Sequence, residues 1–181
     1  MKLPLANVRV LAIEQYGAGP FGTQHLADLG AEVIKLENRR LGGDYARYLG
    51  PFFIDGVESS DKSLFFQAIN RNKKSVSLDL ANPEGQRVFH DLVKTADAVA
   101  NNLRGDVPET LGLTYDALAG VNPAIVCAHC AAYGRDGPRR NWPGYDFLMQ
   151  AETGYLHMSG EPGTPPTRMG LSIVDFLGGT Y

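Results

Sequence analysis

Short apolar segments alternate with helix-like segments along most of this chain, and that alternation constrains the fold more than any other feature. Residues 8–13 (VRVLAI) form an apolar run typical of a buried strand, residues 20–29 predict a helix, and residues 31–37 predict the next strand. Pro20 suits the first position of the helix, and Gly30 suits the residue after its end. The first part of the chain therefore predicts a strand–helix–strand unit.

The alternation continues beyond a polar loop over residues 38–61. We expect a short helix over residues 63–70, a strand over residues 75–80, and a helix that Asn82 caps and that ends near Thr95. Further elements are predicted over residues 96–101 (strand), 115–119 (helix) and 124–128 (strand). Because short loops join these strands through helices, we expect one α/β domain with a Rossmann-like parallel sheet and helices on both faces.

The composition excludes several classes of protein. Of the 181 residues, 44% are hydrophobic and 20% are charged, which is typical of a soluble globular domain. The net charge of −3 argues against nucleic acid or a membrane surface as a partner. The sequence shows no export signal and has two cysteines, so we expect a cytoplasmic protein.

A glycine-rich segment after the first strand has two interpretations. Gly17, Gly19 and Gly22 match the G-x-G-x-x-G pattern of dinucleotide sites, and Glu37 ends the next strand, where such sites bind a ribose. However, Pro20 removes one of the N–H groups that a helix offers to a pyrophosphate. We favour the simpler interpretation, in which small residues allow close packing of the helix.

Two cysteines lie three residues apart, at Cys127 and Cys130, which suggests a metal or redox site. On a strand, however, side chains three residues apart point to opposite faces and cannot share a zinc ion or a disulfide. We therefore expect buried structural cysteines and no metal site.

Basic residues recur at the ends of the predicted elements. A solvated surface explains scattered charge, whereas a cluster at loop ends suits an anionic ligand that carries phosphates, and the pattern favours the two equally. Some of these residues precede their strand. The sequence therefore leaves open whether they lie at the carboxyl edge or at the amino edge of the sheet. The residues are Arg39, Arg40, Arg71, Lys73, Lys74 and Arg104.

A lone carboxylate, Asp175, follows the apolar segment MGLSIV at residues 169–174. This segment predicts a short strand, which would place Asp175 at a strand-to-helix junction, where α/β proteins often carry out their chemistry. An aspartate that caps a helix is held ionised by N–H groups and the helix dipole, as a carboxylate nucleophile requires. The same two interpretations, helix cap and site residue, apply to Asp146.

With these residues in view, the chain resembles the class III (family III) CoA-transferases, the group of formyl-CoA transferase, carnitine CoA-transferase and the α-methylacyl-CoA racemases. The resemblance runs from about Leu5 to the last residue. The segments that carry it are LANVRVLAIEQYGAGP, DLGAEVIKLE, GGDYAR, NRNKKSVSLDL, NPEG, NNLRGD, AAYGRDGP, GYDFLMQAETG, SGEPGTPPTRMG and SIVDFLGG. So many ordered matches are far more specific than any one of them.

The resemblance implies the roles of particular residues. Asp175 would be the catalytic carboxylate. Arg39 or Arg40 would flank the adenine of coenzyme A, and Asn72, Lys73 and Lys74 would line the nucleotide cleft. Three further residues, Asn102, Leu103 and Arg104, would hold the pantetheine–phosphate region, and the residues near the thioester would be Tyr133, Tyr145 and Asp146.

The resemblance also implies a function and an architecture. Residues 1–181 would be the N-terminal part of the large domain, without the small domain and the C-terminal return segment, in a family whose subunits interlock as homodimers. We expect transfer of CoA from an acyl-CoA to a carboxylic acid, with no tightly bound cofactor. Racemases of the family have a histidine where this chain has Tyr145, which favours transfer. The alternatives are a truncated CoA-binding remnant without catalysis, a racemase-like enzyme, or a chain that needs a complementary half.

Overall fold

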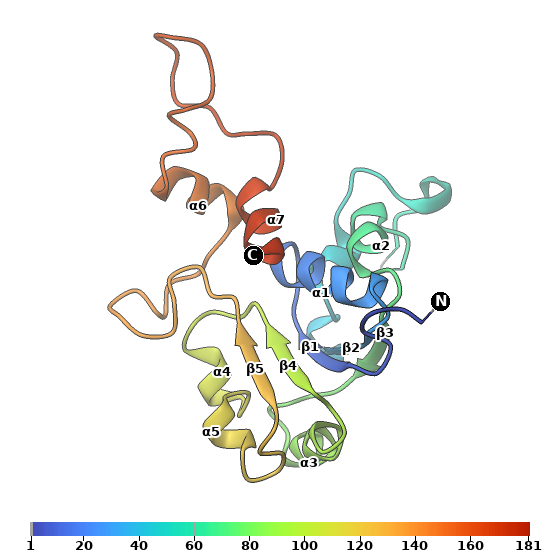
Figure 1. Cartoon of the computed structure of the whole chain (residues 1–181). Coiled ribbons are helices and arrows are strands. Elements are labelled where there is room, and N and C mark those ends of the chain that lie inside the picture. Colours follow the sequence, from blue (N-terminus) through green and yellow to red (C-terminus); the bar gives the residue numbers. More distant parts are fainter. Residues whose placement is uncertain (1, 60) are drawn as a thin grey trace.

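The computed structural model describes residues 2–59 and 61–181, with Arg39 described by its backbone alone. At its centre is a parallel five-stranded sheet in the order β3-β2-β1-β4-β5 (Figure 1). Its strands are β1 (Arg9–Ile13), β2 (Glu32–Glu37), β3 (Lys74–Ser77), β4 (Ala98–Asn101) and β5 (Val126–His129).

The order of the strands reverses beside β1. The chain runs outward from β1 to β3 and then returns to add β4 and β5 on the other side of β1. Leu11 on β1 is therefore paired with Ile34 on β2 and with Val99 on β4. In sheets of this kind, ligands bind outside the carboxyl ends of the strands, where the order reverses.

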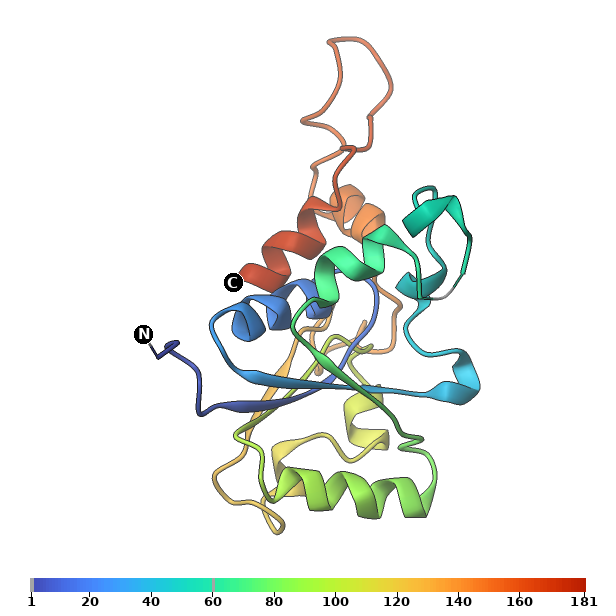
Figure 2. The same ribbon diagram turned by 90° about the vertical axis from the view of Figure 1, so that its right-hand side faces the viewer.

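Helices cover both faces of the sheet, as Figure 2 shows from the side. One face carries α1 (Ala18–Asp28) and α2 (Leu64–Asn70), and the other carries α3 (Pro83–Val93), α4 (Val107–Thr110) and α5 (Tyr115–Leu118). Two later helices, α6 (Asp146–Glu152) and α7 (Ile173–Thr180), lie beyond α1. Short 3-10 turns occur at η1 (Arg39–Leu41), η2 (Tyr45–Tyr48) and η3 (Ile54–Gly56).

The alternation of side chains along the strands builds two cores. Leu11 and Val99 point toward α3 and pack with the fully buried Phe89. Val10 and Val33 point the other way and pack against Ala27 of α1. None of the helices within residues 2–59 and 61–181 combines the length and the apolar character needed to cross a membrane.

The predicted elements occur in the expected order up to β5, with α4 as an additional helix, and Asn82 caps α3 as expected by accepting the Glu84 N–H at 2.9 Å. The predicted start of α1 is wrong, because the helix begins at Ala18 after Gly17 and Pro20 is its third residue. The strand predicted over residues 169–174 is wrong. The buried side chain of Gln150 holds this segment instead, accepting the N–H of Met169 at 3.0 Å and donating to the carbonyl of Leu171 at 3.1 Å. A backbone segment that is bonded to a side chain in this way does not extend the sheet. The helix α7 begins at Ile173, within the segment that was predicted to be a strand.

Candidate active site

Asp175 lies in the first turn of α7, which packs along α1 (Figure 1). A Cβ atom added to Gly17 would overlap the Asp175 carboxylate, and one added to Gly22 would overlap the carbonyl oxygen of Gly179. The rings of Phe21 and Phe176 meet 4.7 Å apart between the same helices. Glycine at the N-cap of α1 (Gly17) and within the helix (Gly22) therefore lets α7 approach closely and brings Asp175 against the turn after β1.

The start of α7 is capped by a carboxylate from another helix. Oδ1 of Asp146 accepts the backbone N–H of Val174 at 2.8 Å and that of Asp175 at 3.2 Å. Gln150 donates to the second oxygen of Asp146, and both side chains are buried. Asp146 therefore does not cap its own helix, as its sequence position had suggested, but caps α7.

Burial, and next the negative charge of Asp146, raise the pKa of Asp175 to about 6. The expectation that helix N–H groups would hold Asp175 ionised is therefore wrong, because Asp146 accepts the N–H of Asp175 itself and that of Val174. A carboxyl group with this pKa is still about nine-tenths ionised at pH 7. It is therefore able to act as a nucleophile or as a base near neutrality.

Two cavities adjoin at the carboxyl edge of the sheet. The cavity that Asp175 lines has a volume of about 690 Å³. A second cavity, of about 420 Å³, lies against the ends of β1 and β2 at the point where the strand order reverses and is mostly apolar. Gln15, Leu103 and Val107 line both. An elongated ligand could therefore run from the strand-order reversal to Asp175.

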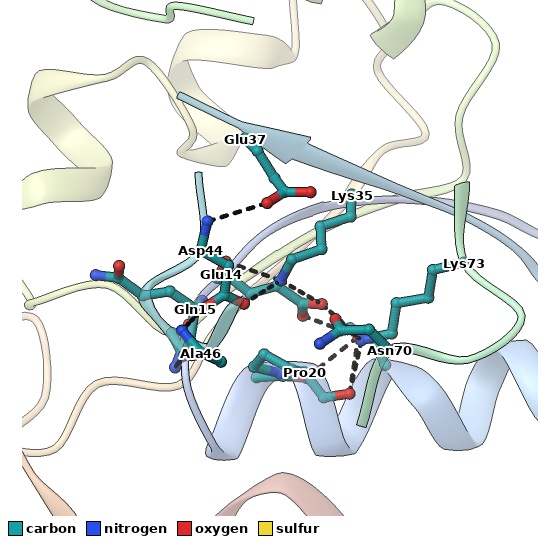
Figure 3. Close-up of polar contacts among 12 residues, drawn as sticks. Glu14, Gln15, Pro20, Lys35, Glu37, Asp44, Ala46, Asn70 and Lys73 are labelled. Atoms are coloured by element: carbon teal, nitrogen blue, oxygen red, sulfur yellow. Dashed lines mark hydrogen bonds and ion pairs between the residues drawn. The ribbon is translucent and has the colours of Figure 1, made fainter. Parts of the chain in front are cut away.

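A buried cluster of four charged side chains lies between the sheet and α1 (Figure 3). Lys35 Nζ lies 2.8 Å from Oδ2 of Asp44, and Lys73 Nζ lies 2.8 Å from Oε1 of Glu14. All four side chains are at most 2% exposed. We call Glu14, Lys35, Asp44 and Lys73 the buried charge cluster; one signal for it was present in the sequence, a lysine within the apolar strand EVIKLE.

Comparison with known proteins identifies the family. The model of CoA-transferase family III matches residues 5–181. This chain belongs to CoA-transferase family III. It is 37% identical over 181 residues to succinate–glutarate CoA-transferase of Agrobacterium fabrum, covering 99% of this chain and 45% of that protein. It is 36% identical over 179 residues to succinyl-CoA:glutarate CoA-transferase of Mus musculus, covering 98% and 39%.

Solved structures agree with this assignment. A CAIB/BAIF family protein from Brucella suis superposes with a TM-score of 0.88 at 35% identity, over 99% of this chain and 48% of that one. The hypothetical protein Rv3272 from Mycobacterium tuberculosis superposes with a TM-score of 0.84 at 37% identity, over 97% and 47%. The chain thus spans somewhat less than half the length of the family III relatives that it matches.

Several of the residues that the family resemblance singled out surround Asp175. Asn102, Leu103, Arg104 and Tyr145 line its cavity. Asn102 also bonds the backbone of Gln15 in both directions, at 3.0 and 2.8 Å. Tyr133 packs edge-on against Trp142, with ring centroids 5.7 Å apart, and Trp142 rather than Tyr133 forms the wall of the cavity.

The remaining predicted contacts lie away from both cavities. Asn72 donates to Asp28, and Lys74 pairs with Glu32, because Asn72 precedes β3 and Lys74 begins it, so both lie at the amino edge of the sheet. Lys73 is withdrawn into the buried charge cluster, where burial lowers its pKa to about 8.

Either Arg39 or Arg40, both of which follow β2, was predicted to flank the adenine of coenzyme A. Arg40 pairs with Asp79 at 3.2 Å and is largely exposed. The predicted adenine contact of the Arg39 side chain falls outside the part of the chain that the structure describes.

Glu37 has no oxygen left for a ribose. Arg47 donates to both of its oxygens at 2.7 and 2.9 Å, and Ser75 and the N–H of Asp44 complete the shell. Burial alone would raise the pKa of Glu37, but these hydrogen bonds lower it to about 2. The favoured interpretation of the glycine motif as a packing motif is thus supported, although its packing partners are α7 and Asn102.

The prediction of two buried cysteines is wrong, because neither side chain is fully buried. Cys127 is half-buried on β5, whereas Cys130 lies exposed after the strand and lines the cavity of Asp175. No group of three or more His, Cys, Asp or Glu side chains within residues 2–59 and 61–181 is arranged to hold a metal ion.

Proposed function

We propose that this chain is the N-terminal, CoA-binding part of the large domain of a CoA-transferase, with Asp175 as its nucleophile. The observation that carries the proposal is the position of Asp175, a carboxylate with a raised pKa in the wall of a cavity that adjoins a second, apolar one. Active sites are where such perturbed carboxylates concentrate. Membership of family III supports the same role.

We propose that coenzyme A occupies both cavities, which share Gln15, Leu103 and Val107 in their walls. We propose that its nucleotide enters the apolar cavity at the ends of β1 and β2 and that its pantetheine arm passes Leu103 and Val107. The thioester then reaches Asp175. Arg104, which lines the cavity of Asp175, would supply positive charge for a phosphate once it exchanges its ion pair with Asp106.

The chemistry conserves the energy of the thioester. The carboxylate of Asp175 attacks the acyl carbonyl, expels the CoA thiolate and forms a mixed anhydride. The thiolate then attacks the aspartyl carbonyl, which releases the first acid and leaves a thioester between Asp175 and CoA. An incoming carboxylate displaces CoA to form a second anhydride, and the thiolate attacks its acyl carbonyl, which releases the new acyl-CoA and the free Asp175.

Both intermediates hydrolyse in water, so the site must be closed during turnover. The chain spans less than half of its relatives, and Tyr145 and Trp142 are half-exposed at the mouth of the cavity. We propose that the remainder of a full-length protein, or a second subunit, covers this mouth. A homodimer is the assembly that the family resemblance favours.

We further propose transfer rather than racemisation, with a dicarboxylic acid as the acceptor. Tyr145 occupies the position at which racemases of the family have a histidine, and tyrosine in general serves less readily than histidine as a base near neutral pH. The matched relatives are named for succinate, glutarate, oxalate and malate, which are all dicarboxylic acids.

Covalent trapping tests the proposal. The protein is incubated with succinyl-CoA and then with hydroxylamine, which converts either aspartyl intermediate to a hydroxamate 15 Da heavier than the free acid, as the replacement of OH by NHOH requires. We expect this mass on the peptide that contains Asp175 and its absence from the Asp175→Asn variant. Asp136, on an exposed loop, provides the matched control, because Asp136→Asn should still be labelled. Equal labelling of wild type and Asp175→Asn contradicts the proposal.

A further inference from the structure

The turn that contacts Asp175 has a strained backbone. Tyr16, between β1 and α1, has a φ of 64°, a left-handed conformation that costs a non-glycine residue about 1 kcal/mol or more. The next residue is Gly17, whose Cα faces the Asp175 carboxylate so closely that no side chain fits between them. Such a conformation persists only where the surrounding structure holds it.

Two side chains hold this turn from opposite sides. Asn102, from the end of β4, bonds the N–H and the carbonyl of Gln15. On the other side, Oδ1 of Asp44 accepts the N–H of Tyr16 at 2.9 Å. The strained residue is therefore fixed through one buried carboxylate oxygen, which also accepts the N–H of Ala46.

The buried charge cluster fixes Asp44 in turn. Its Oδ2 lies 2.8 Å from Lys35 Nζ, and Lys35 also donates to the carbonyl of Glu14 at 3.0 Å, directly before the turn. Lys73 balances the charge of Glu14 and donates to the carbonyl of Pro20 in α1 at 2.7 Å (Figure 3). Buried ion pairs contribute little net stability compared with apolar packing. Their use here is geometric, because every member is bonded to the turn or to its immediate neighbours.

We propose that Asp44, paired with Lys35, is a positioning residue that holds Tyr16 and Gly17 in the conformation against which the Asp175 carboxylate packs. The inference rests on the proposed function of Asp175. The turn excludes water from one side of that carboxylate, and a loosened turn lets water in. Asp44 itself contacts neither the substrate nor the reacting atoms.

A matched pair of double variants isolates the hydrogen bond. Lys35→Met with Asp44→Asn and Lys35→Met with Asp44→Ala both remove one positive and one negative charge, so the cluster stays balanced. Only the first retains an oxygen that accepts the Tyr16 N–H. The pKa of Asp175 is followed by ¹³C NMR of labelled aspartate carboxyls, assigned with Asp175→Asn, and the rate of hydroxamate formation is measured in parallel.

We expect the Asn double variant to keep the pKa of Asp175 near 6 and to be labelled within about threefold of the wild-type rate. The Ala double variant should lower that pKa toward its usual value near 4 and slow labelling by tenfold or more. The other ionisable groups that face Asp175 are Asp146, Cys130 and Tyr16, and neither double variant changes them. Equal pKa values and equal rates in the two variants overturn the proposal.

A second pair of variants, at the exposed residue Tyr16, tests the proposal if the Ala double variant does not fold. Tyr16→Gly retains the N–H and permits the positive φ, whereas Tyr16→Pro removes both. The proline variant should lower the pKa of Asp175 relative to the glycine variant, and identical values overturn the proposal. The pKa is measured without acyl-CoA, so it tests the positioning role even if wild-type protein fails to be labelled, which would refute the proposed function alone.

Discussion

The carboxylate of Asp146 accepts the backbone N–H of Asp175 at 3.2 Å, so one acidic residue caps the helix that carries another. The cap orients α7 and at the same time places a negative charge beside Asp175, which contributes to its raised pKa after burial. The same contact therefore serves both the geometry and the electrostatics of the candidate nucleophile.

Replacing Asp146 separates these two effects. Asp146→Asn retains an oxygen to cap α7 but removes the charge, so the pKa of Asp175 should fall below 6 while the free energy of unfolding changes little. Asp146→Ala removes the cap as well and should lower the free energy of unfolding by about 1 kcal/mol. NMR titration and urea denaturation check the two outcomes. An unchanged pKa in Asp146→Asn would show that burial alone raises it.

The pH dependence of labelling follows from the pKa of Asp175. Only the ionised carboxylate attacks a thioester, so the rate of hydroxamate formation should be constant above pH 7 and fall about tenfold per pH unit below pH 6. The measurement uses succinyl-CoA at fixed concentration between pH 5 and 8. A rate that stays constant down to pH 5 would contradict a pKa of about 6.

The raised pKa also predicts a cost in stability. The folded protein binds a proton at Asp175 more tightly than the unfolded chain does, so the free energy of unfolding falls as the pH rises from about 4 to about 6. Asp175→Asn removes this cost and should stabilise the protein at pH 7 by roughly 1 kcal/mol, allowing for its partial exposure. Urea denaturation at pH 4 and pH 7 should show the gain at pH 7 alone.

Gly17 tolerates no side chain. Gly17→Ala adds a methyl group that overlaps the Asp175 carboxylate, so α7 must shift and labelling of Asp175 should fall by tenfold or more. Gly120→Ala is the matched control, because a Cβ there meets no atom within 4 Å, and its labelling should equal that of wild type. Normal labelling of Gly17→Ala would mean that the turn and the carboxylate do not need to be in contact.

The pair of Glu37 and Arg47 should matter for stability. Both groups are largely buried, and Arg47 also lies over the ring of Phe66 at 4.0 Å, so Arg47→Ala should cost about 3 kcal/mol at pH 7. The pKa of Glu37 is lowered to about 2, so its contribution is present above about pH 4.5 and is lost as the pH falls toward 2. The loss in Arg47→Ala should therefore shrink at pH 2.5.

The exposed pair of Arg87 and Glu84 provides the control for that measurement. Arg87→Ala should change the free energy of unfolding by at most about 0.5 kcal/mol, since water screens the charges of an exposed pair. Equal losses from Arg47→Ala and Arg87→Ala would refute the structural importance of the buried pair.

Local patterns were sufficient for most of the fold. The strands β1 to β5, the Gly30 that follows the end of α1 and the Asn82 cap all depend on neighbouring residues, and they were predicted accordingly. The prediction of a strand before Asp175 was wrong for the opposite reason, because the conformation of this segment depends on a residue distant in the sequence. Its backbone is bonded to Gln150, about twenty positions earlier, and no local pattern reports such a contact.

The sequence by itself determined an α/β sheet, the family and the candidate nucleophile, because periodicity, caps and ordered motifs can be read from consecutive residues. Only the tertiary structure decided the state of that nucleophile. Asp146 reaches Asp175 across 29 positions, and Lys73 reaches Glu14 across 59. Burial and charge act through space, so the raised pKa of Asp175 and the withdrawal of Lys73 from the cavities become visible only once the chain is folded.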